Sequence, residues 1–193
     1  MQSNLEFVTD GSVVYHLAGN EWYAVTQDED KVMLVDTDCK ISTKKLWTWW
    51  SDGDYRSKEG ESGQRILNYC NSIADTYFND IKYVIEPRTV EAGTGKLENA
   101  WMWPMSQEEF TEHKDIGGKI VENSNDNVWT RTFNGIYSNR CAWSVYDTIG
   151  GLDGGYGVDG LFSVAPAFYL RKSTIDYITD DGEIVLKPEN NID

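Results

Sequence analysis

The feature that most constrains the fold of this chain is a set of short strand-like runs at both of its ends, with helical periodicity between them. Near the N-terminus, the apolar runs Val13–Leu17 and Trp22–Thr26 are separated by an Ala-Gly-Asn sequence, which is typical of a tight turn. A third run, Lys31–Val35, follows a short polar segment. These runs predict strands that form an antiparallel hairpin at the start of the domain.

The middle of the chain has the period of helices. From Ser62 to Asn79, apolar residues recur every three or four positions, which predicts an amphipathic helix. A second helix start is marked by Ser-Gln-Glu-Glu at 106–109, a capping box in which the serine accepts an amide hydrogen bond and the glutamate side chain reaches back. We expect this short helix to end at Gly117 and Gly118.

Strand signals return in the last third of the chain, and they lie at Val128–Phe133, Cys141–Tyr146, Phe162–Leu170, Ile175–Ile178 and Glu183–Leu186. Pro166 lies inside one of these runs, which predicts a strand start, a bulge or an edge position there. The turn-type segment Thr179–Gly182 joins the last two runs. We therefore expect one α+β domain with mixed, mostly antiparallel sheets and two short helices, whose core spans about residues 12–186.

The charge of the chain limits its partners. Its 193 residues include 32 acidic and 17 basic side chains, for a formal net charge of −15. Nucleic acids and anionic membranes are bound through clusters of lysine and arginine, and here the basic residues are scattered. No apolar run approaches the roughly 18 residues that a membrane span needs. We therefore expect no nucleic-acid partner and no membrane span.

Segment 134–160 has the composition of a recognition surface. Its 27 residues include seven glycines, three tyrosines, two serines, two asparagines and one tryptophan. Glycine permits unusual backbone conformations, and Tyr, Trp, Asn and Ser make adaptable contacts at a modest entropic cost, as they do in antibody loops. The alternative is a plain glycine-rich connection whose aromatic rings cover the core. The candidate ligand-binding residues are Asn134, Tyr137, Asn139, Arg140, Trp143, Tyr146, Asp147, Tyr156 and Asp159.

A resemblance to a known family rests on the order of several short motifs. In chain order, these are Glu-Trp-Tyr-Ala-Val at 21–25, Lys-Val-Met-Leu-Val at 31–35, Gln-Arg-Ile-Leu-Asn at 64–68, Trp-Pro-Met-Ser-Gln-Glu-Glu at 103–109, Trp-Thr-Arg-Thr at 129–132 and Val-Ala-Pro-Ala-Phe-Tyr-Leu at 164–170. Over roughly residues 12–172, the chain resembles a bacterial and phage domain family of unknown function with a C-type-lectin-like fold. It departs from that family at Ala165, where the family usually has Arg, and at Thr132, where it often has Ser.

The resemblance implies a function as well as a fold with long ligand-facing loops. Similar C-type-lectin-like domains serve as the variable proteins of diversity-generating retroelements, which rewrite adenine-templated codons near the C-terminus. In that class, scaffold strands hold the hypervariable side chains on one ligand-facing surface, and residues 129–170 occupy the matching place here. We therefore expect residues 1–193 to form a single domain that binds a protein or glycan ligand without a cofactor. Receptor binding by a phage, or adhesion at a bacterial cell surface, is the expected setting.

A sugar-binding lectin, calcium-dependent or calcium-independent, is the nearest alternative. Calcium takes about six to eight oxygen ligands at compact spacing, and lectins of this fold usually supply them from Glu-Pro-Asn or Gln-Pro-Asp followed by Trp-Asn-Asp. The sequences Glu-Pro-Arg at 86–88 and Pro-Glu-Asn at 188–190 match neither motif. Asp147, Asp153 and Asp159 recur every six residues, a spacing that specifies no known calcium site. We therefore expect no metal site.

An enzyme is the second alternative, because the formylglycine-generating oxidases have a related fold. Those oxidases need a reactive pair of cysteines. This chain has only Cys141 in its C-terminal half, and Cys39 and Cys70 are distant from it in sequence. His16 and His113 are the only histidines, and no Ser-His-Asp pattern surrounds them. We therefore expect no catalytic residues, and a domain that binds its ligand without transforming it.

Overall fold

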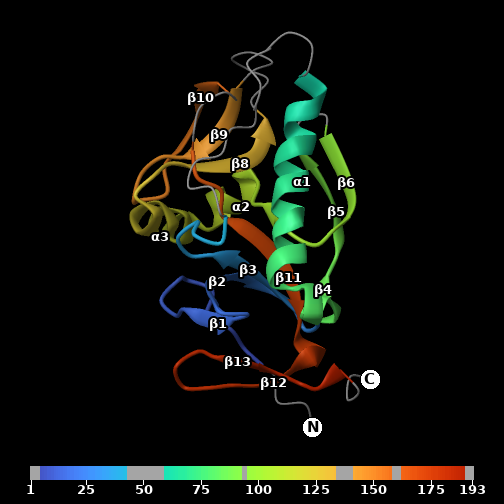
Figure 1. The fold of residues 1–193 in the computed structure, drawn as a ribbon. Helices are drawn as coiled ribbons and strands as arrows, with labels where there is room; N and C mark the ends of the chain where they lie inside the picture. Colours follow the sequence, from blue (N-terminus) through green and yellow to red (C-terminus); the bar gives the residue numbers. More distant parts are fainter. Residues whose placement is uncertain (1–4, 43–58, 93–94, 134–140, 158–161, 190–193) are drawn as a thin grey trace.

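The computed structural model of the chain describes residues 5–42, 59–92, 95–133, 141–157 and 162–189. The largest sheet contains the strands β1 (Tyr15–Leu17), β2 (Asn20–Gln27), β3 (Lys31–Asp36), β4 (Ile85–Glu86), β7 (Trp103–Pro104) and β11 (Pro166–Arg171). The other elements are α1 (Glu59–Tyr77), η1 (Asn79–Val84), β5 (Arg88–Ala92), β6 (Gly95–Ala100), α2 (Gln107–Glu112), α3 (Lys114–Ser124), β8 (Val128–Phe133), β9 (Cys141–Val145), β10 (Leu152–Gly157), η2 (Lys172–Thr174), β12 (Ile175–Ile178) and β13 (Ile184–Leu186). The predicted class, α+β with mostly antiparallel sheets, is confirmed (Figure 1).

The N-terminal strands form the predicted hairpin, and β11 completes their sheet. Ala18 and Gly19 have φ angles of 54° and 73°, and two successive positive φ angles fit the tight turn between β1 and β2. β11 lies between β3 on one side and the short strands β4 and β7 on the other. The start and the end of the chain therefore meet in one sheet. Pro166 is the first residue of β11, which is one of the three positions that its missing amide donor predicted.

Helix α1 packs across two parts of the core. Ile66 belongs to a buried cluster that includes Trp103 and Trp129. Further along the helix, Ile73 belongs to a second buried cluster, which includes Trp22. The helix is 19 residues long and begins three residues before the predicted start, so it is not a short helix as expected.

The hairpin of β5 and β6 lies beside α1 (Figure 1) and was not predicted from the sequence. Five of its eleven residues are polar and exposed, but Val90, Ala92 and Ala100 are buried in the same cluster as Ile66 and Leu67 of α1. The side chain of Asn71 in α1 accepts a hydrogen bond from the amide of Trp101, just after β6 (2.7 Å). The hairpin thus gains its stability from the helix that covers it.

Ser106 caps α2 as predicted. Its side chain accepts a hydrogen bond from the amide of Glu109 (3.1 Å), and the Glu109 carboxylate accepts one from the amide of Ser106 (2.6 Å), which completes the capping box. The prediction that Gly117 and Gly118 end this helix was wrong, because both lie inside the separate helix α3. A Cβ on Gly118 would lie 2.1 Å from the carbonyl oxygen of Thr148, so only glycine allows α3 to approach that loop. The described residues therefore contain three α-helices, not two short ones.

The second sheet has the order β10–β9–β8, and its strands β9 and β10 lie within segment 134–160. β10 has the sequence Leu-Asp-Gly-Gly-Tyr-Gly, and its register against β9 shifts between Asp153 and Tyr156. Part of the expected ligand-facing loop is therefore a bulged strand.

A last hairpin, of β12 and β13, contacts β1 through a bridge between His16 and Glu183. Its turn is the predicted one, in which the amide of Gly182 donates to the carbonyl oxygen of Thr179 (3.0 Å) and Gly182 has a φ of 87°. Among the described helices, none combines the length and the apolar character that crossing a bilayer requires.

Candidate ligand-binding surface

The structure describes the side chains of three of the nine predicted ligand-binding residues. Trp143 lies in β9, and Tyr146 and Asp147 lie in the turn that joins β9 to β10. Tyr156 lies in β10 and pairs with Ala142, but its side chain is outside the described part of the chain. The predicted residues that lie wholly outside the described residues are Asn134, Tyr137, Asn139, Arg140 and Asp159.

Residues of the β8–β9–β10 sheet belong to two different buried clusters. Val128 and Val145 are buried with Phe110 of α2 and with apolar residues of α3. Trp129 and Ala142 belong instead to the cluster that contains Ile66 and Leu67 of α1. The sheet is therefore held by two sets of core contacts.

The turn between β9 and β10 is closed by its own hydrogen bonds. The amide of Tyr146 donates to the carbonyl oxygen of Gly151 (3.0 Å), and the amide of Gly150 donates to that of Asp147 (3.1 Å). The Oδ1 atom of Asp147 accepts hydrogen bonds from the amides of Gly151 (2.6 Å) and Ile149 (3.2 Å). Asp147 therefore shapes the turn, and one of its oxygens is already engaged within the protein.

Two glycines clamp this turn onto α3. A Cβ on Gly150 would lie 2.1 Å from the carbonyl oxygen of Lys114, and the φ of Gly150 is 73°. On the helix side, Gly118 of α3 contacts Thr148 of the turn, and a Cβ on Gly118 would also lie 2.1 Å from the carbonyl oxygen of Thr148. Backbone packs on backbone at both places, so the turn has little room to move relative to the helix.

The clamped turn nevertheless exposes large apolar side chains. The exposed fraction is 46% for Tyr146 and 78% for Ile149. Among the described residues, the other exposed large apolar side chains are Val8 and Tyr177, which lie elsewhere in the chain. Trp143, three residues before Tyr146, is half-buried. Ile149 was not among the predicted site residues, although a lone aliphatic residue between Thr and Gly in a turn was a signal that could have found it.

Charged residues beside the sheet are engaged with one another. The Nη2 atom of Arg131 in β8 donates to Glu109 Oε1 (3.1 Å), and Nη1 of Arg88 in β5 lies 3.6 Å from the same oxygen. The guanidinium of Arg88 also lies over the ring of Trp103, 5.2 Å from its centroid. Burial lowers the pKa of Arg131 from its ordinary value, and the charge of Glu109 opposes this shift. This network joins β5, β8 and α2, so it contributes to the scaffold.

The Trp-Thr-Arg-Thr motif at 129–132, which carries part of the family resemblance, attaches β8 to α2. Thr132 Oγ1 accepts a hydrogen bond from the amide of Gln107 (2.9 Å), and the amide of Arg131 donates to the carbonyl oxygen of Met105 (2.9 Å). Ala165, where the family usually has Arg, is buried in the core beside β3. These motif positions serve packing in this chain.

Candidate metal ligands do not gather in the described part of the chain. No group of three or more His, Cys, Asp or Glu side chains that could hold a metal ion occurs among those residues. Cys39 and Cys70 are buried free thiols, and burial raises the pKa of each above its ordinary value. A raised pKa keeps a thiol protonated and unreactive.

Comparison with known proteins gives no match: no protein-family model, no curated protein and no solved structure matches this chain. Its function therefore has to be inferred from its residues and their geometry.

Proposed function

We propose that this chain is a non-enzymatic ligand-binding domain with a C-type-lectin-like fold, and that its ligand contacts the end of β9 and the turn after it. One observation carries the proposal: the β9–β10 turn is clamped to α3, yet it exposes Tyr146 and Ile149. Aromatic and aliphatic side chains held rigidly in solvent are typical of the residues that anchor an interface. Because the turn is already ordered, a ligand that covers it loses little conformational entropy.

The sheet topology supports the C-type-lectin-like assignment. The family resemblance begins with the N-terminal hairpin and ends with the strand at 164–170, and β11 pairs directly with β3 of that hairpin. The separate sheet of β8, β9 and β10 then lies at the end of the molecule opposite β12 and β13 (Figure 1). This arrangement suits a domain that keeps its scaffold strands at one end and its contact residues at the other.

The apolar side chains of the turn set the scale of the affinity. Fully burying an isoleucine side chain contributes about 1.5–3 kcal/mol, and most of Ile149 is available for burial because 78% of it is exposed. Tyr146 adds a ring that is nearly half exposed and a hydroxyl group that can hydrogen-bond to a ligand. Together, these two residues account for roughly 3 kcal/mol, or about a hundredfold in affinity.

The resemblance to variable proteins of diversity-generating retroelements adds to the proposal which segment would vary and what kind of ligand it would bind. Residues 129–170 would be the diversified segment, and the ligand would be a protein or a glycan on a cell surface. The sequence of related alleles tests this part separately. Differences confined to adenine-derived codons of residues 129–170, beside a reverse transcriptase gene, would support diversification, and differences spread evenly along the chain would exclude it.

Binding to defined probes tests the contact surface. A fluorescently labelled chain is applied to a glycan microarray and to a panel of intact bacterial cells, alongside the double variant Tyr146→Ala/Ile149→Ala. We expect the double variant to lose at least tenfold in apparent affinity for every probe that the wild type binds. Both side chains are exposed, so its melting temperature should change little.

Tyr177→Ala is the matched control. Tyr177 is 51% exposed, but it lies on β12, at the other end of the molecule (Figure 1). We expect this variant to bind as the wild type does. Undiminished binding by the double variant, or an equal loss caused by Tyr177→Ala, would refute the assignment of the surface to the β9–β10 turn.

A further inference from the structure

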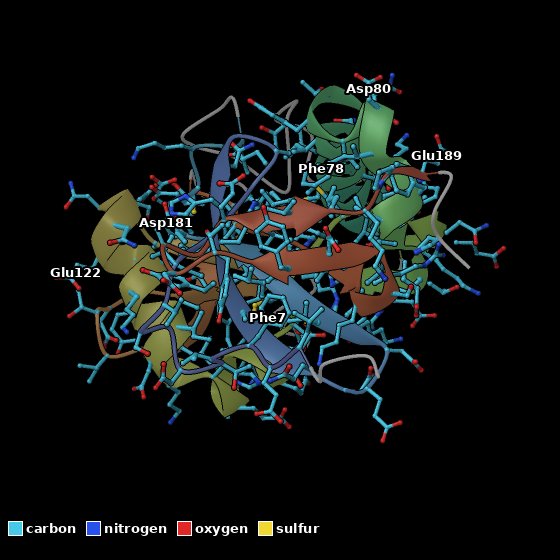
Figure 2. The ribbon with its side chains drawn as sticks, turned by 90° about the horizontal axis from the view of Figure 1, so that it is seen from below. Phe7, Phe78, Asp80, Glu122, Asp181 and Glu189 are labelled. Carbon is cyan, nitrogen blue, oxygen red and sulfur yellow. The ribbon has the colours of Figure 1, made fainter. Side chains whose placement is uncertain are left out.

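A cavity of about 710 Å³ lies away from the β9–β10 turn, where the turn between β2 and β3 meets η2 and β12. Figure 2 looks onto this end of the molecule, where β12 and β13 lie in front of the first sheet. The N-terminal segment around Leu5 and the residue after β13, Lys187, complete its lining. A volume of this size lies within the range of roughly 300–1,000 Å³ that is typical of small-ligand sites.

Three cationic side chains line the cavity, and each is held by neutral oxygens. Arg171 Nη1 donates to the carbonyl oxygen of Tyr83 (3.1 Å). Lys172 Nζ donates to Gln27 Oε1 (2.8 Å) and to the carbonyl oxygen of Asp28 (2.7 Å), and Lys187 Nζ donates to that of Ser173 (2.8 Å). None of the three cations forms an ion pair within the described part of the chain. These hydrogen bonds orient the three side chains, and no direct contact with a carboxylate of the described residues neutralises their charges.

Carboxylates that line the same cavity fall into two groups. Asp28 accepts hydrogen bonds from the amides of Asp30 and Lys31, and Glu86 forms an ion pair with Lys31 (2.5 Å), so these two have structural roles. The remaining carboxylates make no ion pair with any described residue, and they are Glu6, Glu29, Asp30 and Asp176. Unpaired charges of both signs therefore face one cavity.

The lining also contains two apolar side chains. Ile175 is buried at the start of β12, and Leu5 is half-buried. Leu5 therefore offers apolar surface beside the charged groups, whereas Ile175 is only 1% exposed. A ligand that fits this lining carries a positive charge, a negative charge and an aliphatic portion.

We propose that this cavity binds a short aliphatic peptide whose amino and carboxyl ends are both free. Its carboxylate would pair with the cations of Arg171, Lys172 and Lys187. Its ammonium group would pair with the unpaired carboxylates, and its side chain would lie on Leu5. A purely anionic ligand is disfavoured by the net charge of −15, and a purely cationic ligand would meet three fixed cations. A zwitterion satisfies both sets of charges. This inference does not depend on the proposed function of the β9–β10 turn.

The dipeptide Ala-Leu is the probe, and its blocked forms are the matched ligand controls. Binding to the full chain is measured by calorimetry and by amide chemical shifts. We expect the free dipeptide to shift amides of η2 and of the β2–β3 turn. Acetylation of its amino end, or amidation of its carboxyl end, should each lower the affinity at least tenfold. Absence of binding at about 10 mM dipeptide, or equal binding of the blocked forms, would overturn the proposal.

Substitutions in the cavity provide the second arm of the test. Lys187→Met and Asp176→Asn each remove one unpaired charge, and each should weaken dipeptide binding severalfold while the chain stays folded. Lys96→Met is the control, because Lys96 is an exposed lysine that pairs with Glu98 on β6 and does not line the cavity. The Tyr146→Ala/Ile149→Ala variant should bind the dipeptide normally. A loss of dipeptide binding in the control, or in that double variant, would contradict the assignment of this cavity.

Discussion

Replacing Asp36 by asparagine should change the pH dependence of folding, because this carboxyl group is buried. Asp36 is the last residue of β3, it is 2% exposed, and its Oδ2 atom has no hydrogen-bond partner among the described residues. Burial raises its pKa from 3.8 to about 7, and the charge of Asp38 adds to the rise. Hydrogen bonds from the amides of Asp38, Ile41 and Thr37 oppose the shift without cancelling it.

The raised pKa means that the folded protein holds a proton on Asp36 more tightly than the unfolded chain does. The stability that this proton supplies is fully present below pH 3.8, and it is lost as the pH rises through about 7. Between about pH 5 and about pH 8, a shift of this size lowers the free energy of unfolding by about 3 kcal/mol. Asparagine keeps an acceptor oxygen and does not titrate, so the Asp36→Asn variant escapes this loss.

Urea unfolding followed by tryptophan fluorescence measures the effect. The free energy of unfolding is determined for the wild type and for Asp36→Asn at about pH 5 and about pH 8. From the lower to the higher pH, the free energy of unfolding of the variant should rise relative to that of the wild type by about 3 kcal/mol. Glu122→Gln, an exposed position on α3, is the control and should leave the difference constant. If the difference for Asp36→Asn is the same at both pH values, the reasoning from burial is refuted.

Three further predictions concern the scaffold. Gly118→Ala should lower the free energy of unfolding by about 3 kcal/mol, because its Cβ would meet the carbonyl oxygen of Thr148 at 2.1 Å. The control is Gly19→Ala, whose Cβ would meet no atom within 4 Å and which should cost only about 1–2 kcal/mol from its positive φ. Equal losses in the two variants would contradict the close packing of α3 on the β9–β10 turn. Ser106→Ala should lower the same free energy by about 1 kcal/mol through loss of the α2 cap, and an unchanged urea midpoint would show that the cap contributes nothing. Addition of a chelator should leave the melting temperature unchanged, because no group of three or more potential metal ligands occurs among the described residues. A clear drop in melting temperature would reveal a metal site and favour the calcium-dependent lectin.

The elements that were predicted well are those whose own residues show a clear apolar pattern or a capping motif. β8 and β12 have the predicted bounds, and the capping box at Ser106 marks the start of α2 correctly. In contrast, β5 and β6 contain too many polar residues for an alternating pattern, and their few buried side chains pack on α1. Such strands depend on a partner that is distant in sequence, so their pattern could not be read locally.

For the candidate site, the sequence and the structure draw attention to the same region but not to the same residues. Sequence composition pointed to the region of Trp143 and Tyr146, and the structure exposes Tyr146 at the end of β9. The sequence did not distinguish Asp147 from the other candidate residues, although its carboxylate accepts amide hydrogen bonds of the turn. It also did not indicate the cavity near Arg171 and Lys187, because the residues that line it come from both ends of the chain. Long-range folding, rather than residue type, brings those charges together.

The glycines of the C-terminal third show that composition alone does not define a binding surface. Gly150 is required by its positive φ and by its contact with Lys114, and a Cβ on Gly151 would lie 2.5 Å from the carboxylate of Asp147. Because packing explains these glycines, they are no evidence for ligand binding. The proposal of a binding surface depends instead on the exposed side chains of Tyr146 and Ile149. Exposed side chains on a turn that is fixed through its backbone can be replaced without disturbing the core. A domain that diversifies its contact residues needs that separation between scaffold and surface.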